Sequence, residues 1–411
     1  MTDTYDVLIV GGGLVGASLA IALDNSSLRL ALVEAVPARA DHQPSYDERN
    51  LALAAATVNA LQALGVWTHV SSRATPICRI HVSRQGEFGA ARLEAAKHGI
   101  ESFGAVLPAR ELGNGLLARL SACSNLARHA PASLVALTVG SEAVLATLAG
   151  AEPRVISARL VVGADGTHSF VRGAHVIETD NVDYAQTAFV TTVTPQRALD
   201  GCAFERFTAT GPVALLPLSE RRAGVVLTVP AADAARVAAL DDDGFLELLH
   251  DRFGWRLGRL SRLGKRVSYP LKCVRATRLT ATRTVLVGNA AQTLHPIGAQ
   301  GFNLGLRDAL TLAELLVARF GGDDAGAPAL LHEYARRRAA DRDGTAAMSD
   351  SLARFTASEA LPLKLLRSLG LIALDRIPAL QEQLVRRGMG FRGVVPRLAL
   401  HDTLSSAGDG Q

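Results

Sequence analysis

One glycine-rich segment carries residue types that could act on a closely bound group. It reads GNAAQTLHPIGAQGFNLGLRDA, spans residues 288–309 and follows the apolar run TVLV. Glycine inside a helix or strand costs about 0.5 to 1 kcal/mol relative to alanine, so the segment is not one regular element throughout. Its glycines begin where a strand ends, which is where open α/β sheets bind ligands. We therefore expect this backbone to lie against a ligand.

A second glycine cluster lies near the amino terminus, in YDVLIVGGGLVGASLAIAL. The pattern GxGxxG falls on Gly11, Gly13 and Gly16, between an expected strand at residues 5–10 and a helix from about Leu14. In dinucleotide sites the first glycine makes a tight turn, the second admits the pyrophosphate and the third lets helix and strand pack closely. The helix N-terminus then offers free N–H groups to the phosphates. The pattern predicts a dinucleotide site.

Glu34 ends the next expected strand, LRLALVE. Its distance from the glycines is close to the roughly 20 residues typical of a carboxylate that binds ribose hydroxyls. A carboxylate suits a free 2′-hydroxyl and not a 2′-phosphate, which favours FAD or NAD over NADP. The rest of the chain has no second GxGxxG, so a nicotinamide would bind without a Rossmann unit of its own.

Two further segments carry polar residues at turns. The segment DERNLALAAATVNALQALGVW, from Asp47 to Trp67, places Arg49 just before an apolar helix. Arg49 is either a ligand-binding residue or a plain surface arginine at the start of this helix. ARLVVGADGTHSFVR predicts a strand over residues 158–162 that breaks around Asp165, and here the alternative is an ordinary Asp-Gly turn.

The order of these motifs resembles the single-component flavoprotein aromatic hydroxylases of the p-hydroxybenzoate hydroxylase type. The resemblance covers about residues 1–345. The third motif contributes Gly163, Ala164, Asp165, Gly166, Ser169, Val171 and Arg172. The chain departs from the family in two ways: Asn289 and Gln292 stand where the family usually has Asp and His, and the usual AGQG reads GAQG at residues 298–301. The ubiquinone-biosynthesis branch, above all its 2-polyprenyl-6-methoxyphenol hydroxylases, has the same two residues, and YDERNLALAAAT at residues 46–57 is also similar to that branch.

The resemblance implies that FAD is the cofactor and that residues 288–303 wrap its flavin ring. It places Asn289 near the ribityl chain and Pro296 beside the isoalloxazine. A helix starting near Gly301 would direct its N-terminus at the flavin N1 and O2, where a dipole contributes about 0.3 to 2 kcal/mol. The cofactor residues implied for this segment are Gly288, Asn289, Pro296, Gly298, Gln300, Gly301, Phe302 and Asn303. Outside it, the resemblance implies that Arg49 and Asp165 also bind the cofactor.

The resemblance also implies a reaction. NAD(P)H reduces FAD, dioxygen forms a C4a-hydroperoxide, and an oxygen atom passes to a phenol bearing a polyprenyl tail. Pro296 and His295 are the expected residues nearest the chemistry, although His295 could equally be a structural histidine. Arg110, in LPARELGNGLLARL, could meet the FAD phosphates or be a surface arginine at a helix start. No metal site is expected.

The fold expected from the resemblance is α/β: a Rossmann-like FAD-binding domain with an inserted β-sheet substrate domain and a C-terminal helical tail. PVALLPL, residues 212–218, could line an isoprenoid pocket, although apolar strand residues are more often core. The expected boundaries are 1–75, 101–172 and 281–350 for the FAD-binding domain, 76–100 and 173–280 for the substrate domain, and 351–411 for the tail.

Charge and composition limit the partners. The chain has 43 basic and 39 acidic residues and no basic run interleaved with aromatics, so we expect no nucleic acid partner. The four cysteines are far apart, which is typical of a reduced, cytoplasmic protein, and no apolar run is long enough to span a membrane.

The region from residue 360 to 400 alternates leucines with basic residues. Such a tail could lie on the inner face of an anionic membrane, or dock on its own domain or on a partner in a ubiquinone-biosynthesis complex. Residues 405–411 are expected to be disordered. The competing functions are a hydroxylase of a soluble aromatic compound, a prenyl reductase, and a non-catalytic flavin-binding scaffold.

Overall fold

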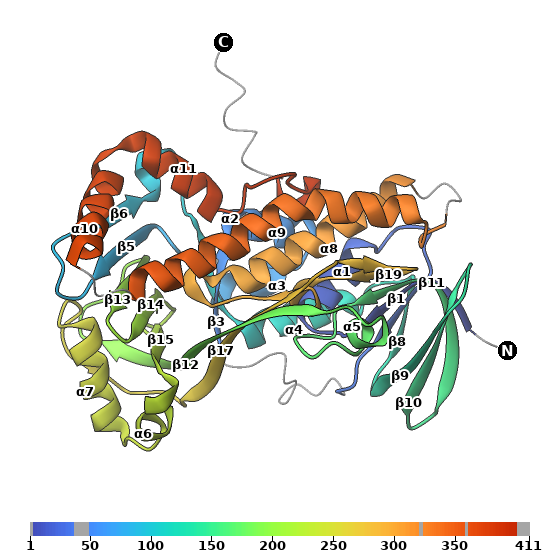
Figure 1. Ribbon diagram of the computed structural model, residues 1–411, viewed down its shortest axis with the longest axis horizontal. Coiled ribbons are helices and arrows are strands. Elements are labelled where there is room, and N and C mark those ends of the chain that lie inside the picture. Colours follow the sequence, from blue (N-terminus) through green and yellow to red (C-terminus); the bar gives the residue numbers. More distant parts are fainter. Residues whose placement is uncertain (1–2, 37–48, 320–323, 358–360, 401–411) are drawn as a thin grey trace, which may run out of the picture.

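The computed structural model describes residues 3–36, 49–319, 324–357 and 361–400. The predictions for Tyr46, Asp47 and residues 405–411 lie outside these ranges. Within them the chain forms two large sheets joined by a long helix, as Figure 1 shows. The expected domain boundaries stay predictions, but the two-sheet arrangement is the expected α/β fold.

The first sheet has eight strands in the order β18-β19-β11-β1-β2-β8, with β10 joining β11 to β9. Its centre is parallel, as a doubly wound nucleotide fold requires. The bounds are β1 (Asp3–Val10), β2 (Leu30–Val33), β8 (Leu126–His129), β9 (Ala132–Val139), β10 (Val144–Gly150), β11 (Arg154–Gly163), β18 (Thr280–Ala281) and β19 (Thr284–Leu286).

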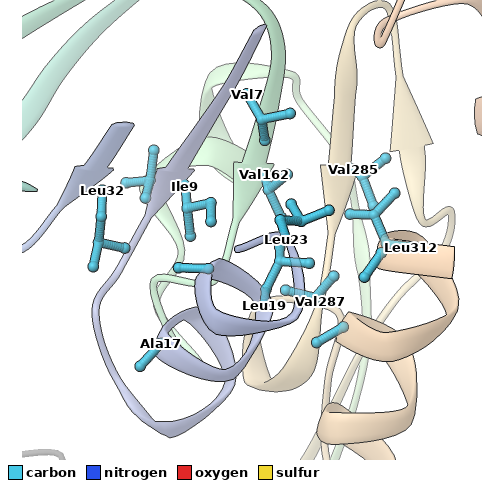
Figure 2. Close-up of a cluster of buried hydrophobic side chains, with 14 of the residues drawn as sticks. Val7, Ile9, Ala17, Leu19, Leu23, Leu32, Val162, Val285, Val287 and Leu312 are labelled. Carbon is cyan, nitrogen blue, oxygen red and sulfur yellow. The ribbon is translucent and has the colours of Figure 1, made fainter. Parts of the chain in front are cut away.

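Helices cover this sheet and close its core. Residues 6–10 of β1 are buried throughout, as in a strand covered on both faces. Figure 2 shows Ile9 and Val162 on neighbouring strands meeting Leu19 of one helix and Leu312 of another. The helices packed on or beside this sheet are α1 (Leu14–Ala22), α4 (Ala109–Leu120), α5 (Phe170–Ala174), α8 (Gln300–Arg319) and α9 (Pro328–Ala357).

The second sheet has nine strands in the order β20-β17-β12-β15-β14-β13-β5-β6, with β16 paired to β12. Two helices, α6 (Ala234–Ala238) and α7 (Asp242–Phe253), cover one of its faces. The strands are β5 (Arg79–Arg84), β6 (Ala90–Glu94), β12 (Thr179–Pro195), β13 (Cys202–Thr208), β14 (Gly211–Pro217), β15 (Ala223–Pro230), β16 (Leu260–Ser261), β17 (Val267–Ala276) and β20 (Gln292–Thr293).

A small third sheet, β3 (Asn50–Ala54), β7 (Gly104–Pro108) and β4 (Thr75–Pro76), continues into α2 (Ala55–Ala63) and α3 (Trp67–Val70). Its Ala52 and Val106 pack with Leu216 of the nine-stranded sheet. Two more helices, α10 (Leu361–Arg376) and α11 (Pro378–Gly388), lie beside β6 at the end of the molecule opposite β9 and β10 (Figure 1). No helix among the described residues is long and apolar enough to cross a membrane.

Candidate functional site

The glycine loop after β1 is fixed by close contacts between backbones. Gly11 has φ +104°, and a Cβ there would lie 2.5 Å from the carbonyl oxygen of Ala164 on the neighbouring segment. A Cβ at Gly16 would lie 1.9 Å from the oxygen of Gly11. Gly13 precedes α1 in an extended conformation and gives that helix no side-chain cap. The first N–H groups of α1 are therefore available to an anion such as a phosphate.

Glu34 holds the other side of this loop. Its Oε2 accepts a hydrogen bond from the Gly12 N–H at 2.7 Å, and its Oε1 accepts one from the Val36 N–H at 2.9 Å. Each oxygen keeps a second lone pair for a ligand hydroxyl. Beside it lies a shallow hollow lined by Gly12, Leu32, Glu34, Val36, Leu117, Leu120, Arg128 and Ala130. Apolar walls beside one carboxylate suit a nucleoside.

Asp165 shapes the turn after β11. Its Oδ1 accepts from the Ser169 hydroxyl at 2.5 Å and its Oδ2 from the Val171 N–H at 3.1 Å, so the carboxylate caps α5. The guanidinium of Arg172 donates to the carbonyls of Thr167 at 2.7 Å and Ala290 at 2.9 Å. This motif therefore supports the loop at residues 288–290, which agrees with the structural alternative for the Asp-Gly turn.

A buried polar network lies under the glycine-rich segment. Asp308 on α8 accepts three hydrogen bonds: from the Gly288 N–H at 3.1 Å, from Gln292 Nε2 at 2.6 Å and from Arg338 Nε at 2.7 Å. Gln292 also accepts from Arg342 Nε at 3.1 Å. The amide can donate to a carboxylate and accept from a guanidinium at once. The substitution of Gln for the family's usual His therefore has a structural role in this network.

The outer side of the same segment is open. Asn289, Pro296 and Gly298 are exposed, and a Cβ built on Gly301 would meet nothing within 4 Å. Gly298 has φ +69° and its carbonyl accepts from Gln300 Nε2 at 2.9 Å, just before α8 begins at Gln300. The expected helix start at Gly301 is therefore correct within one residue. Loop and helix N-terminus together leave backbone accessible to a flat ligand.

The next two residues of α8 face the protein. Phe302 packs, partly buried, against the core. Asn303 makes four hydrogen bonds at 2.7 to 2.9 Å: its Oδ1 accepts from the Ala54 N–H and the Thr57 hydroxyl, and its Nδ2 donates to the carbonyls of Ala52 and Ala299. Asn303 thus links β3 to Ala299, in the loop before α8. Because its side chain is used in these bonds, a contact between Asn303 and a cofactor would come from its backbone.

His295 is buried, and both of its ring nitrogens have partners. Nδ1 accepts from the Ile297 N–H at 3.2 Å, so Nε2 carries the hydrogen and faces Gln186 Oε1 at 3.4 Å. The Tyr184 ring packs edge-on with centroids 4.8 Å apart. Burial lowers the pKa of His295 to about 4. A neutral imidazole held on both sides favours the structural alternative over a catalytic base.

Arg49 and Arg110, far apart in the sequence, are brought together. The Arg49 carbonyl accepts from the Ala109 N–H at 2.8 Å, and Arg110 follows in the first turn of α4. Both side chains are exposed. The Arg49 guanidinium lies 5.5 Å from the centre of the Tyr269 ring on β17, between the two large sheets. The backbones of the two arginines are thus close together, and the exposed cation of each suits an anionic ligand.

The two glycine segments also meet each other. A Cβ on Gly288, which has φ +58°, would lie 3.0 Å from the Val15 side chain in the first turn of α1. A Cβ on Gly305 of α8 would lie 3.0 Å from the Gly288 Cα. The start of α1 therefore lies next to the glycine-rich segment. The uncapped helix start, the Glu34 hollow and the open loop together have the chemistry that suits an extended dinucleotide such as FAD.

Some site residues have no recognisable signal in the sequence. Asp308 stands in the quoted motif, but its role depends on Arg338, thirty residues later on another helix. Arg338 lies in the run RRR, which indicates a solvated helix face, yet its side chain is completely buried. Arg128 of the hollow comes from β8, a strand that carries no motif.

Comparison with known proteins agrees with this geometry. Residues 4–347 match the FAD binding domain family. A ubiquinone hydroxylase, UbiL, of Rhodospirillum rubrum is 38% identical over 389 residues, covering 94% of this chain and 89% of that protein. The 3-demethoxyubiquinol 3-hydroxylase of Escherichia coli is 32% identical, covering 94% and 98%. The solved structure of p-nitrophenol 4-monooxygenase from Pseudomonas putida is similar in fold, with a TM-score of 0.79, 18% identity and coverage of 95% and 99%.

Proposed function

This chain belongs to the FAD binding domain family, and we propose that within it the protein hydroxylates a polyprenylated phenol, 2-polyprenyl-6-methoxyphenol, in ubiquinone biosynthesis. The expected family, the α/β fold, the FAD cofactor and the class of FAD-dependent monooxygenase are confirmed. The observation that carries the substrate proposal is the likeness, over nearly the whole chain, to two relatives named as ubiquinone-pathway hydroxylases.

FAD supplies the oxygen-transfer chemistry when it is bound, with NAD(P)H as the electron donor typical of the family. The chain's own residues bind and orient it. Gly13 and the α1 N-terminus would take the pyrophosphate and Glu34 the ribose, while Pro296 and the backbone of residues 298–303 would lie beside the flavin. Arg49 and Arg110 would add positive charge near the phosphates.

A second candidate substrate is 3-demethoxyubiquinol. The 32% identical relative from Escherichia coli is named for hydroxylating it. Both substrates are electron-rich rings with a polyprenyl tail, so one kind of pocket suits either, and the ring position that is hydroxylated distinguishes them.

The first test is a mass-spectrometric profile of quinone lipids from a strain lacking this gene. We expect ubiquinone to be depleted and polyprenyl-methoxyphenol to accumulate, with both restored by the intact gene. Accumulation of demethoxyubiquinol instead would assign the second candidate. An unchanged quinone pool would refute both and favour a soluble aromatic substrate. Restoration by a gene whose purified product binds FAD but does not oxidise NAD(P)H with substrate would indicate a scaffold.

The cofactor residues are tested by two substitutions. Gly13→Val should block the approach of the pyrophosphate and yield protein without flavin, because a branched side chain would project over the start of α1. Arg49→Ala should weaken FAD binding without unfolding the chain. A full flavin spectrum in purified Gly13→Val would count heavily against the assignment of this loop.

The C-terminal helices support a peripheral membrane contact. One face of α10 docks on its own domain: Arg367 Nη2 donates to Glu87 Oε1 at 2.7 Å, and Ser368 is buried beside it. The opposite face exposes 57 to 59% of each of Leu365, Leu366 and Leu369. The next helix, α11, exposes Leu380 and Leu384. Arg376 at the end of α10 is also exposed, as are Arg386 and Arg387 of α11. Exposed leucines beside arginines suit an anionic lipid surface, where a lipid-soluble substrate is found.

Flotation with vesicles that contain anionic phospholipid tests this contact. The wild-type holoenzyme should float with anionic vesicles and less with neutral ones, and Leu366→Asn with Leu369→Asn should abolish flotation. Leu145→Asn, at an exposed leucine of β10, is the matched control. Flotation that these changes at α10 leave intact would contradict the contact.

A further inference from the structure

The two faces of the nine-stranded sheet can be assigned from strand register. Phe204 of β13 packs with the α7 side, whereas its neighbours Ala203 and Leu216 pack with the small sheet on the other side. Because side chains alternate along a strand, Glu205 lies on the same face as Ala203. That face looks toward β3 and the flavin loop: Gln186 on it meets His295 at 3.4 Å.

Glu205 is the one polar residue in a row that crosses the sheet. Its paired neighbours are Val82 on β5 and Ala214 on β14. From Ala214 the row continues through Val226 and Val190 to Val267. A carboxyl in an otherwise apolar row lowers the stability of the fold, because nothing beside it replaces the hydrogen bonds of water. A residue kept at such a cost is a candidate for a functional role.

The row is only partly covered. Val82, Glu205, Ala214, Leu216 and Val226 are each partly exposed, although the side chains behind them, on the α7 face, are buried. Within the part of the chain that the structure describes, no hydrogen bond or ion pair is found for the Glu205 carboxyl. An apolar floor with one carboxyl, facing a flavin loop, has the composition of a site for a ring with an apolar tail and one hydroxyl.

We propose that Glu205 accepts the proton of the substrate's phenolic hydroxyl, a role that rests on the proposed function. The O–H bond breaks and its proton passes to the carboxylate, while the oxygen lone pair enters the ring and makes the para carbon more nucleophilic. That carbon takes one oxygen atom of dioxygen and later loses its ring proton. The other oxygen atom leaves as water with two electrons from NAD(P)H.

The surroundings suit this role. Burial raises the pKa of Glu205 to about 7, near the ideal value for a base that works at neutral pH. On the adjacent strand β5, His81, which contacts Arg256, lies on the opposite face, as does Arg206, which follows Glu205 in the chain. Arg84 lies on the same face as Glu205, where Glu87 pairs with its guanidinium at 2.9 Å. On the flavin side, the titratable and charged groups are His295 beside Gln186, Arg49 over Tyr269, and Asp350 of α9, which accepts from Tyr184.

The test compares Glu205→Gln, Glu205→Asp and the matched control Glu247→Gln, an exposed residue of α7, all as FAD-loaded protein. The probe is 2-methoxy-6-prenylphenol, a short analogue of the proposed substrate. For the wild type and the control, kcat/KM should rise with pH through about 7, because the carboxylate is the active form. For Glu205→Gln it should fall about 100-fold at pH 8 and lose that rise. Glu205→Asp should restore part of the rate and its pH dependence.

A second readout does not require turnover. The oxidised holoenzyme without nicotinamide should shift the ultraviolet absorption of the bound probe toward that of the phenolate, and Glu205→Gln should not, while keeping its flavin spectrum. Wild-type turnover that Glu205→Gln retains, with the same pH profile, would overturn the role of Glu205 and leave the proposed function standing. A wild type that neither turns over nor ionises the probe would overturn both.

Discussion

The two faces of the nine-stranded sheet are built from the same strands but differ in burial and in polarity. On the α7 side Val213, Leu215, Val225 and Leu227 are fully buried and pack against Phe245. On the flavin side Ala214, Leu216 and Val226, their neighbours in sequence, are partly exposed, and Glu205, which pairs with Ala214, adds a carboxyl. A single period-two pattern thus produces a packing face and a face that we assign to the substrate.

The difference between the faces explains why both interpretations of the segment PVALLPL hold, each for different residues of β14. PVALLPL was open to interpretation as pocket lining or as core, and the structure divides it by parity. Val213 and Leu215 are core, while Ala214 and Leu216 lie on the partly covered face. Stability should therefore depend on the first set, and substrate binding on the second.

The largest effect is expected on the packing face. Phe245 of α7 is fully buried and its ring lies 6.2 Å from that of Phe189. Phe245→Ala should lower the free energy of unfolding by about 3 to 5 kcal/mol, from lost transfer energy and the cavity left behind. Urea unfolding measures this. The matched control is Phe88→Ala, at a ring that is 68% exposed, where a comparable loss would break the comparison.

On the flavin face we expect a substitution that raises the free energy of unfolding instead of lowering it. The pKa of Glu205 is about 7 in the folded chain against an ordinary 4.5, so folding favours the protonated form and wild-type stability falls as pH rises from about 4.5 to 7. Glu205→Gln removes that loss. At pH 8 it should be more stable than the wild type by up to about 3 kcal/mol, less the part that solvent screens. Melting curves at pH 4 and pH 8 test this, and a stabilisation equal at both would contradict the linkage.

A smaller and finely matched effect separates adjacent valines of β15. Val225 is fully buried on the packing face, and Val226 is partly exposed on the other. Val225→Ala should cost about 2 kcal/mol and Val226→Ala less than 1, from about 0.8 kcal/mol per buried methylene plus a cavity. Only Val226→Ala should raise KM for the prenylphenol. Equal unfolding costs together with equal KM values would remove the distinction between the faces.

Local signals predicted the nucleotide fold well. The expected strand at residues 5–10 lies within β1, and the helix begins at Leu14 as expected. The turn between them is specified locally, because a Cβ on Gly16 would collide with the carbonyl oxygen of nearby Gly11. The expected strand at residues 158–162 also lies within β11. Here the local signal is a continuous apolar run, which indicates a buried strand.

The rest of the site depends on contacts between distant segments. Asn303 was expected to contact the cofactor, a prediction that stays open, but three of the four partners of its side chain are 246 to 251 residues away. Nothing in the sequence distinguishes Arg338, because charge alone does not reveal a buried carboxylate partner. Glu205, in AFERF, likewise has no signal of its own, because polar residues are common on one side of an alternating strand. Its setting depends on five strand pairings that periodicity does not specify.

The meeting of Gly11 with Ala164, and of Gly288 with Val15, has a practical consequence for handling the protein. The three segments that we expect to form the cofactor site come from the beginning, the middle and the last third of the chain. A ribosome must therefore translate beyond Asn303 before the site can close, and a fragment ending earlier should remain colourless. The yellow of bound flavin in a cell extract would then report that the whole chain has folded, which makes colour a simple screen for damaged variants.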